Sequence, residues 1–230
     1  MIIIGHRGAR ATCPENTIAA LREGSRCADY VEIDVRLSRD RVPVVIHDPT
    51  LERTTNGTGL VSDYTLPELK ALDAGEGEQI PTLAEVFALD HGGCGLVIEL
   101  KEGGYEDQIA AMVSESMGRG SVSDILIVSF DADCLRHIAQ LLPDAEVGYI
   151  FRSVEPDPIL VAASIPASTI LPRFDLVSWE LISSARKADL RVIAWTLNTD
   201  EEYMAAAQLG VDGMATDDPC HARSFLSNGY

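Results

Sequence analysis

Short apolar runs alternate with helically spaced segments along this chain, and this alternation limits its fold more than any other feature. Strand-like runs are found at residues 2–4, 30–35, 42–47, 96–100, 125–130, 147–151, 169–171, 192–197 and 213–216. Between most of them, apolar residues recur at the three- and four-residue spacing of an amphipathic helix. Strand–helix alternation in a chain of 230 residues predicts a parallel α/β sheet, and in particular a closed (β/α)₈ barrel, the TIM barrel.

The third run is the exception to this rhythm. Residues 36–41, which precede it, are too few for a crossover helix. We therefore expect residues 42–47 to fold back antiparallel on the second strand, through a turn near Asp40 and Arg41. Eight barrel strands then remain, and His47 comes close to Asp34. A doubly wound open sheet would also fit the alternation.

Several helix boundaries can be predicted from capping residues. Pro14 and Glu15 open a helix that reaches about Arg26. Asp200 is positioned to cap a helix that ends before Gly210. Two further helices begin with the Thr-x-x-Glu capping box, formed by Thr65 with Glu68 and by Thr82 with Glu85. Residues 1–230 are expected to form a single domain, in which the polar span at about 48–79 is the longest departure from the rhythm.

Composition excludes several classes of partner. A formal net charge of −18 would repel nucleic acid and anionic membranes, so we expect neither partner and no stable membrane association. No run reaches the length of a membrane span, and no basic segment followed by an apolar one opens the chain. The cysteines are odd in number and lack a Cys-x-x-Cys pair, which indicates reduced residues and a cytoplasmic protein. They are Cys13, Cys27, Cys94, Cys134 and Cys220.

Three carboxylates and a lysine stand near the ends of two predicted strands. Glu32 and Asp34 are two residues apart, so their side chains share one face of the strand. At about 4 Å and an effective dielectric near 20, they repel by roughly 4 kcal/mol. Glu99 and Lys101 repeat the same spacing. An exposed strand end or a surface salt bridge would explain one such pair. Several pairs at one end of a barrel instead favour a carboxyl group with a raised pKa, or a bound hard divalent cation.

Two histidines are predicted at the same end of the barrel. His6 follows the first strand together with Arg7, between two glycines that permit a tight turn and close approach of a ligand. His47 closes the third run. Two histidines can divide the deprotonation of a nucleophile and the protonation of a leaving group. With the carboxylates and basic side chains, they indicate metal-assisted phosphoryl transfer. We assign no role to the other three, His91, His137 and His221.

The ordered motifs of the chain resemble those of the glycerophosphodiester phosphodiesterases. They are HRG at 6–8, PENT at 14–17, VEIDVRLSRDRVPVVIHD at 31–48, LERTTNGTG at 51–59, IPTLAEV at 80–86, IELK at 98–101, SFD at 129–131, WTLN at 195–198 and TDDP at 216–219. The resemblance covers nearly the whole chain. It implies a (β/α)₈ barrel that hydrolyses glycerophosphodiesters, a small-molecule substrate, to glycerol 3-phosphate and an alcohol.

The resemblance also implies a role for each group. Carried over by position, Glu32, Asp34 and Glu99 bind one divalent cation, Mg²⁺ or Ca²⁺; His6 and His47 are the general acid and base; Arg7 and Lys101 hold the phosphate. A glycerol hydroxyl attacks phosphorus first, and water then opens the cyclic phosphate. Residues 48–79 are the family's small insertion after the His–Asp motif and cap the mouth of the barrel on the glycerol side.

Glu15 and Trp195 each have more than one possible role. Glu15 is expected to tether the His6 loop or contact a glycerol hydroxyl, unless it is simply a first-turn glutamate favoured by the helix dipole. Trp195 forms either an apolar wall for the substrate or part of the barrel core. Asp217 is expected to stabilise the end of the last strand. Pro172 and Arg173 depart from the family pattern, and we expect loops after the late strands to select the alcohol.

Two other functions remain open at this point. Phospholipase C-like and sphingomyelinase-like phosphodiesterases share the histidine pair and the carboxylates, but they work at membranes, which the net charge disfavours. A catalytically silent barrel used as a binding scaffold is the second alternative. It would be expected to have lost a histidine or a metal ligand, and every expected position is filled. The expected oligomeric state is a monomer or a homodimer.

Overall fold

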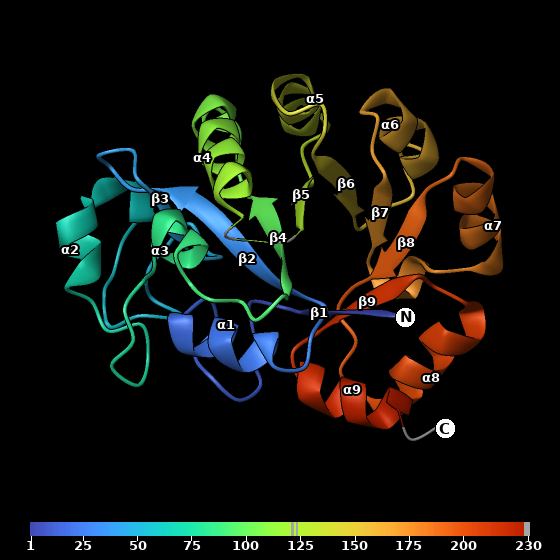
Figure 1. Cartoon of the computed structure of the whole chain (residues 1–230), viewed down its shortest axis with the longest axis horizontal. Helices are drawn as coiled ribbons and strands as arrows, with labels where there is room; N and C mark the ends of the chain where they lie inside the picture. Colours follow the sequence, from blue (N-terminus) through green and yellow to red (C-terminus); the bar gives the residue numbers. More distant parts are fainter. Residues whose placement is uncertain (121, 123, 228–230) are drawn as a thin grey trace.

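Eight parallel strands close into a barrel in the computed structural model, which describes residues 1–120, 122 and 124–227 (Figure 1). The strands are β1 (Ile2–Gly5), β2 (Tyr30–Leu37), β4 (Gly95–Leu100), β5 (Ile125–Ser129), β6 (Glu146–Phe151), β7 (Thr169–Pro172), β8 (Arg191–Ala194) and β9 (Gly213–Thr216). Strand β1 pairs in parallel with both β9 and β2, which closes the ring. The predicted (β/α)₈ barrel is therefore confirmed, and the open sheet is excluded.

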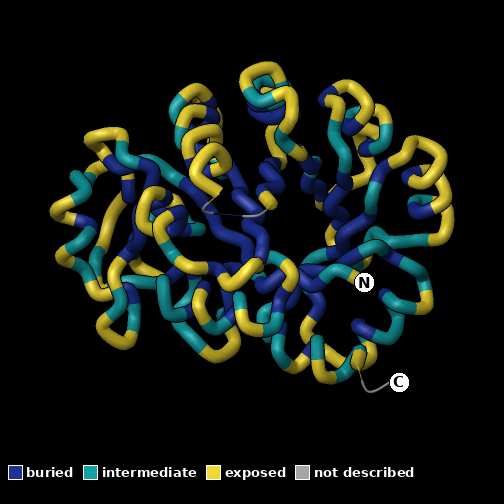
Figure 2. Tube along the Cα trace, viewed as in Figure 1, coloured by how far each residue is buried: buried dark blue, intermediate teal, exposed yellow. Residues whose placement is uncertain are grey.

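Helices surround the ring of strands, as Figure 1 shows. They are α1 (Ile18–Ser25), α3 (Leu83–Phe87), α4 (Glu106–Arg119), α5 (Ala132–Leu141), α6 (Pro158–Ser164), α7 (Trp179–Lys187), α8 (Asp200–Leu209) and α9 (Pro219–Ser227). Alternating strand residues face opposite sides, so the barrel has two cores. Ile33, Ile98 and Ile127 are buried against the helices, whereas Ile4 and Val97 are buried inside the barrel. Figure 2 shows the strands as the buried centre of the molecule.

The third predicted strand forms the expected hairpin. β3 (Pro43–Val45) pairs antiparallel with β2, with Val35 opposite Val45. The turn includes Arg41, whose φ of 59° is left-handed. β3 is shorter than predicted, because the chain leaves the sheet after Ile46 donates its backbone N–H to the Asp34 carbonyl. The hairpin brings His47 to the end of β2.

The segment that follows the hairpin has an apolar core of its own. It contains the 3₁₀ helix η1 (Val61–Asp63) and α2 (Leu66–Lys70), and lies beside β3 at the left of Figure 1. This core consists of Val44 from β3 together with Ile46, Leu51, Val61, Leu69, Ala74 and Ile80. The capping boxes predicted at Thr65 and Thr82 begin α2 and α3.

Two helices begin later or are capped differently than predicted. α1 starts at Ile18 rather than near Pro14, with Thr17 as its N-cap. Asn16 has a left-handed φ of 59°, which a helix cannot contain. α8 starts at Asp200, but its N-cap is Thr199, which forms a capping box with Glu202.

The prediction that all cysteines are reduced is wrong for two of them. Cys27, just after α1, forms a disulfide with Cys220 in α9, and 193 residues separate them. Cys13, Cys94 and Cys134 are free. The two half-cystines are distant in sequence and become neighbours only because β1 lies beside β9, a pairing that cysteine spacing does not show. No helix in the described ranges is long and apolar enough to cross a membrane.

Candidate active site

The carboxyl ends of the strands surround a cavity of about 870 Å³. Ile4, Val97 and Val128 from the barrel interior line it. Seven of the residues singled out from the sequence also line it, namely His6, Arg7, Glu32, His47, Glu99, Lys101 and Trp195. Asp34 is buried, and it pairs with Arg7 and Lys101 of the cavity wall. The predicted groups thus meet at one end of the barrel, where TIM-barrel enzymes carry their active sites.

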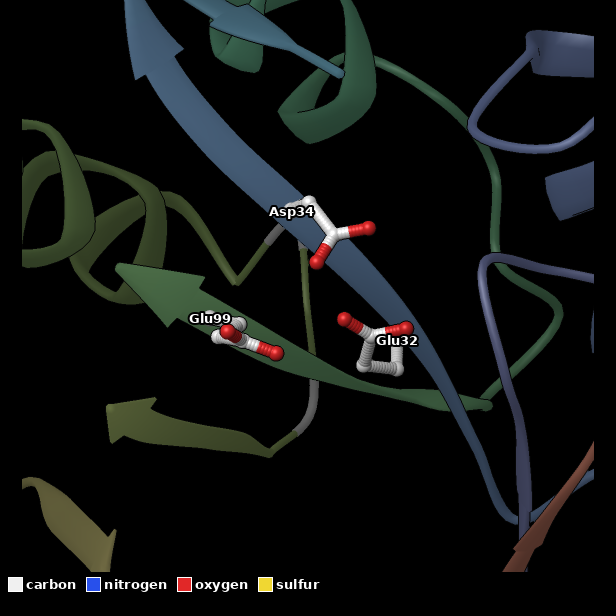
Figure 3. Close-up of side chains that lie close together, drawn as sticks. All are labelled: Glu32, Asp34 and Glu99. Carbon is white, nitrogen blue, oxygen red and sulfur yellow. The ribbon is translucent and has the colours of Figure 1, made fainter. Parts of the chain in front are cut away.

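Three buried carboxylates point toward one another at this end of the barrel (Figure 3). We call Glu32, Asp34 and Glu99 the carboxylate cluster. Each contributes an oxygen that lies within 4.8 Å of those of the other two. Asp34 on β2 is in register with Glu99 on β4, and alternation along β2 places Glu32 on the same inner face. The two-residue spacing and parallel pairing therefore produce the cluster.

Glu32 has the strongest need for a neutralising partner. Its Oε2 accepts a hydrogen bond of 2.8 Å from the backbone N–H of Arg7. Its Oε1 is buried and lacks a hydrogen-bond partner among the described residues. Burial, with the charges of Asp34 and Glu99, raises the pKa of Glu32 well above its usual range. A buried carboxylate oxygen without a partner is costly, so this atom marks a position for a ligand.

The other two carboxylates share the basic side chains. Asp34 Oδ2 accepts from Asn16 Nδ2 at 2.8 Å, and Oδ1 lies 3.2 Å from Lys101 Nζ. Although burial opposes its charge, Lys101 and Arg7 hold the pKa of Asp34 below its usual value. Lys101 also donates to Glu99. Burial and then the charge of Asp34 raise the pKa of Glu99 to about 7.

The carboxylate cluster fits a hard divalent cation. Such cations prefer carboxylate oxygens. The cluster offers one oxygen from each of its three carboxylates, and Oε1 of Glu32 has no hydrogen-bond partner among the described residues. When all three carboxylates are ionised, their negative charges exceed the two positive charges of Arg7 and Lys101 by one. A divalent cation would remove the repulsion that raises the pKa values of Glu32 and Glu99.

A tight turn places Arg7 over the carboxylate cluster. Gly8 has a φ of +86°, and a Cβ atom there would lie 2.5 Å from the backbone of Ala20 in α1, so only glycine fits. Arg7 itself has a left-handed φ of 54°. In this conformation its N–H points at Glu32, and its Nε lies 3.3 Å from Asp34 Oδ2.

Each candidate catalytic histidine is bonded to an aspartate. His6 Nδ1 lies 2.7 Å from Asp217 Oδ1, and His47 Nδ1 lies 2.6 Å from Asp48 Oδ1. Both rings line the cavity, and with Nδ1 occupied it is Nε2 that remains for a substrate. Burial lowers the pKa of both histidines, although their aspartates oppose the shift. The aspartates fix each ring in one orientation.

Further bonds hold these two aspartates. Asp217 Oδ2 accepts from Asn198 Nδ2 at 3.0 Å, and the Asp217 N–H donates to Asn198 Oδ1 at 2.9 Å. Asp48 Oδ2 accepts from Arg53 Nε at 2.6 Å. Arg53 reaches from the same side to Glu15, whose Oε1 and Oε2 each accept from it at 2.8 Å. Glu15 also accepts from Arg7 at 2.7 Å.

Glu15 therefore links the loop after β1 to the segment after β3. Although burial opposes its charge, Arg53 and Arg7 lower the pKa of Glu15 to about 2. It precedes α1 by three residues and does not lie in its first turn. The tethering interpretation of Glu15 therefore agrees with its contacts, whereas the helix-dipole interpretation does not.

Trp195 lies on the far side of the cavity. Its ring packs partly against the barrel interior, and its Nε1 donates to the Leu171 carbonyl at 2.8 Å. Phe130 meets it in a T-shaped contact with ring centroids 5.8 Å apart. Both rings line the cavity. Trp195 thus belongs both to the inner core and to the wall of the cavity.

Comparison with known proteins identifies the family. The glycerophosphoryl diester phosphodiesterase family matches residues 6–221. The chain belongs to this family. A glycerophosphodiester phosphodiesterase of Caldanaerobacter subterraneus subsp. tengcongensis is 36% identical over 95% of this chain and 94% of its own. A further relative of Bacillus subtilis, described as a putative glycerophosphodiester phosphodiesterase, is 37% identical over 95% of each chain.

Solved structures of glycerophosphodiester phosphodiesterases share the fold. A phosphodiesterase of Oleispira antarctica, in complex with the product sn-glycerol-3-phosphate, has a TM-score of 0.91 and 30% identity, covering 99% of this chain and 97% of its own. The enzyme of Agrobacterium tumefaciens has a TM-score of 0.84 and 32% identity, with 97% and 99% covered. The chain is accordingly an enzyme, a phosphoric diester hydrolase of the glycerophosphodiester phosphodiesterase family.

Four residues of this phosphodiesterase site were missed or undervalued from the sequence. Asp48 and Asp217 orient the histidines, Asn16 fixes Asp34, and Arg53 joins Asp48 to Glu15. Each lies inside a motif quoted for the family, which is the signal that could have found them. Spacing alone does not predict them, because their partners come from other strands or loops or, for Asp48, from the adjacent histidine.

Proposed function

We propose that this phosphodiesterase hydrolyses glycerophosphodiesters to glycerol 3-phosphate and an alcohol. The observation that carries the proposal is the pairing of two aspartate-bonded histidines with the carboxylate cluster around one cavity. The structurally similar Oleispira antarctica phosphodiesterase, solved with sn-glycerol-3-phosphate, supports this choice of product.

The carboxylate cluster would hold one divalent cation, Mg²⁺ or Ca²⁺. Glu32, Asp34 and Glu99 would be its protein ligands, and the bound ion would supply positive charge to the phosphoryl oxygens. Arg7 and Lys101 would contribute further positive charge on the cavity wall. Phosphate oxygens in this position lie between cationic groups, which favours the charge that develops during the transfer.

His6 and His47 would share the proton transfers. A glycerol hydroxyl gives its proton to one imidazole as its oxygen bonds to phosphorus. The other imidazole protonates the departing alcohol oxygen, which leaves a cyclic phosphate. In the second half of the reaction, water loses its proton to one histidine as its oxygen bonds to phosphorus, the ring P–O bond breaks, and the other histidine protonates the released glycerol oxygen, giving glycerol 3-phosphate. Burial lowers both pKa values, which favours the neutral form needed by the base.

Two further residues would position the substrate. Glu15 holds Arg7 at one side of the cavity and lies beside the segment after β3, which we place on the glycerol side as the family's insertion. Trp195 would form an apolar wall on the opposite side, where the late-strand loops lie. One domain of residues 1–230 with an insertion at about 48–79 remains our prediction for the domain organisation.

The histidines provide the direct test of this function. We expect His6→Ala and His47→Ala each to lower kcat by a factor of at least about 10², with unchanged circular dichroism. His137→Ala is the control, because His137 is half exposed on α5, and the residues lining the cavity do not include it. Near-normal turnover in either cavity variant would remove that histidine from the mechanism.

The choice of substrate is tested with purified enzyme and added Mg²⁺ or Ca²⁺. We expect release of glycerol 3-phosphate from glycerophosphocholine and glycerophosphoethanolamine. Turnover of intact phospholipid or sphingomyelin alone would instead assign the chain to a phospholipase C-like or sphingomyelinase-like activity. Absence of turnover on every diester, in enzyme with saturating metal, would favour a silent barrel.

The cellular setting remains a prediction. The sequence predicts a cytoplasmic protein that is a monomer or a homodimer. The Cys27–Cys220 bond weighs against a cytoplasmic location, because disulfides persist in oxidising compartments and are rare in the cytosol of most organisms.

A further inference from the structure

The cavity has two chemically different walls. His6, Arg7 and the carboxylate cluster lie at the ends of β1, β2 and β4. Arg152 directly follows β6. In the ring of eight strands β6 lies four places from β1 in either direction, by way of β2, β4 and β5 or of β9, β8 and β7. Arg152 therefore lies across the cavity from His6 and Arg7, and two strands away from Glu99 and Lys101 at the end of β4.

Aromatic side chains hold Arg152 at this wall. Its Cζ lies 5.9 Å from the centroid of the Phe130 ring, within the range of a cation–π contact. Phe130 is in turn fixed by the T-shaped contact with Trp195, which is anchored to the Leu171 carbonyl. All three side chains line the cavity. A guanidinium group stacked on a ring keeps its N–H donors in the plane and free to bind an anion.

No carboxylate in the described part of the chain pairs with Arg152, although the chain carries 36 Asp and Glu residues. The cavity-lining acidic side chains outside the carboxylate cluster are engaged elsewhere. Glu102 lies 3.7 Å from Arg36, and Asp131 accepts from the N–H groups of Asp133 and Cys134 at the start of α5. Within the described residues, Arg152 is thus an exposed positive charge with no internal counter-ion.

Arg173, at the corresponding end of the next strand, shows the opposite arrangement. Its Nε and Nη2 each donate to the carboxylate of Asp175 at 2.6 Å. It is also not among the residues that line the cavity. The two arginines therefore form a natural pair for comparison, one already neutralised and one available to a ligand.

We propose that Arg152 binds an anionic group carried by the alcohol half of the substrate. The enzyme then prefers glycerophosphodiesters whose alcohol bears a carboxylate or a further phosphate over those whose alcohol is cationic. This inference rests on the proposed function, because the phosphodiester at the carboxylate cluster directs the alcohol toward the opposite wall. An ammonium group would meet the charge of Arg152 and find the Phe130 face already covered.

Glycerophosphoserine and glycerophosphoethanolamine provide the test, because they differ by one carboxylate. We expect kcat/KM of the metal-loaded enzyme to be about tenfold higher for the serine diester, the size expected of one charge-assisted contact. Arg152→Gln is expected to bring the ratio to about one, mainly through KM for the serine diester, and Arg152→Glu to invert it. Arg173→Gln is the matched control and is expected to keep the wild-type ratio. Because each ratio is taken within one variant, a loss of folded enzyme does not alter it.

A glycerol diester with a phosphorylated alcohol separates the two sources of negative charge. If the wild-type enzyme prefers the phosphorylated diester and Arg152→Gln abolishes this preference, the result supports the same contact between Arg152 and a phosphate. A wild-type serine-to-ethanolamine ratio near one, or a tenfold ratio that survives in Arg152→Gln, would overturn the inference while the proposed function stands. If the wild-type enzyme cleaves no diester with metal present, the proposed function itself fails.

Discussion

At the scale of single residues, the site depends on side chains that hold other side chains. His6 and His47 line the cavity, and an aspartate bonded to each Nδ1 leaves Nε2 for a substrate. The histidines follow from the sequence, since they close strand-like runs. Their partners do not, because Asp217 is 211 residues from His6 and only closure of the barrel brings them together.

Asp217 is predicted to be a positioning residue. Asp217→Asn preserves its size but removes the charge that favours the imidazolium form of His6. We expect kcat to fall by about tenfold or more, and the pH limb that belongs to His6 to move to lower pH. The measurement is a pH–rate profile of the metal-loaded enzyme.

Asp218→Asn is the control for this experiment. Asp218 is the next residue, and its carboxylate accepts only a backbone N–H, that of His221, in the contacts seen here. The Asp218→Asn variant is expected to keep the pH–rate profile of the wild-type enzyme. A reduced rate with an unshifted profile in Asp217→Asn would show a structural effect instead.

Glu15 makes stability depend on pH in the acid range. Its pKa is lowered to about 2 from the usual 4.5, so the folded state favours the carboxylate. The resulting stabilisation is fully present above pH 4.5, and it is lost as the pH falls toward 2. We expect Glu15→Gln to lower the free energy of unfolding at pH 7 by about 1–3 kcal/mol.

The difference between wild type and Glu15→Gln should shrink below pH 4.5 and vanish near pH 2. Urea unfolding at a series of pH values measures it. Glu201→Gln, at an exposed position in the first turn of α8, is the control. A difference that stays constant from pH 7 to pH 2 would contradict the role of the carboxylate charge.

At the scale of secondary structure elements, the sequence predicts strands better than it predicts helix starts. The nine strand-like runs correspond to β1 to β9, and their ends agree within two residues except at the end of β8, which stops at Ala194 rather than at 197, because buried strands are marked by continuous apolar runs. α1 begins four residues after Pro14 because Asn16 adopts a left-handed φ and bonds to Asp34. A functional contact therefore overrides the local signal.

The register of β2 and β4 creates the proposed metal site. We expect Glu99→Gln to weaken Mg²⁺ or Ca²⁺ binding by at least tenfold, because it replaces one of three charged ligands. Calorimetric titration of metal into enzyme treated with EDTA measures the affinity. EDTA should also abolish activity, and either ion should restore it.

Glu102→Gln is the matched control for metal binding. Glu102 lies three residues further along the chain and lines the same cavity, but it pairs with Arg36 and lies outside the carboxylate cluster. Its replacement should leave the affinity unchanged. An unaltered titration in Glu99→Gln would mean that the third ligand lies elsewhere.

At the scale of the whole molecule, the disulfide joins two parts of the barrel from opposite ends of the chain. Cys27 follows α1 and Cys220 lies in α9, and the bond encloses a loop of about the whole domain. A bond that closes so long a loop restricts the unfolded chain, and typically stabilises by about 2–4 kcal/mol. We expect Cys27→Ser to lower the free energy of unfolding by that amount.

Cys13→Ser is expected to have little effect, because Cys13 is free. Thiol titration of the denatured protein should find three thiols without reductant, matching Cys13, Cys94 and Cys134. Five thiols without reductant, together with equal stability of Cys27→Ser and wild type, would show that the bond does not form.

The separate apolar core of the segment after β3 has an evolutionary consequence. Its buried side chains form one apolar cluster, and it is held to the barrel by the hairpin, by the contacts of Arg53, and by polar contacts of Glu78 with Ala19 and of Lys70 with Glu85. This part of the protein can therefore diverge, or be grafted from a relative in a chimera, while the barrel keeps its chemistry, as long as Asp48 and Arg53 are retained to hold His47 and Glu15. New substrate preferences would then be acquired by exchanging this segment, without changing the carboxylate cluster or the two histidines.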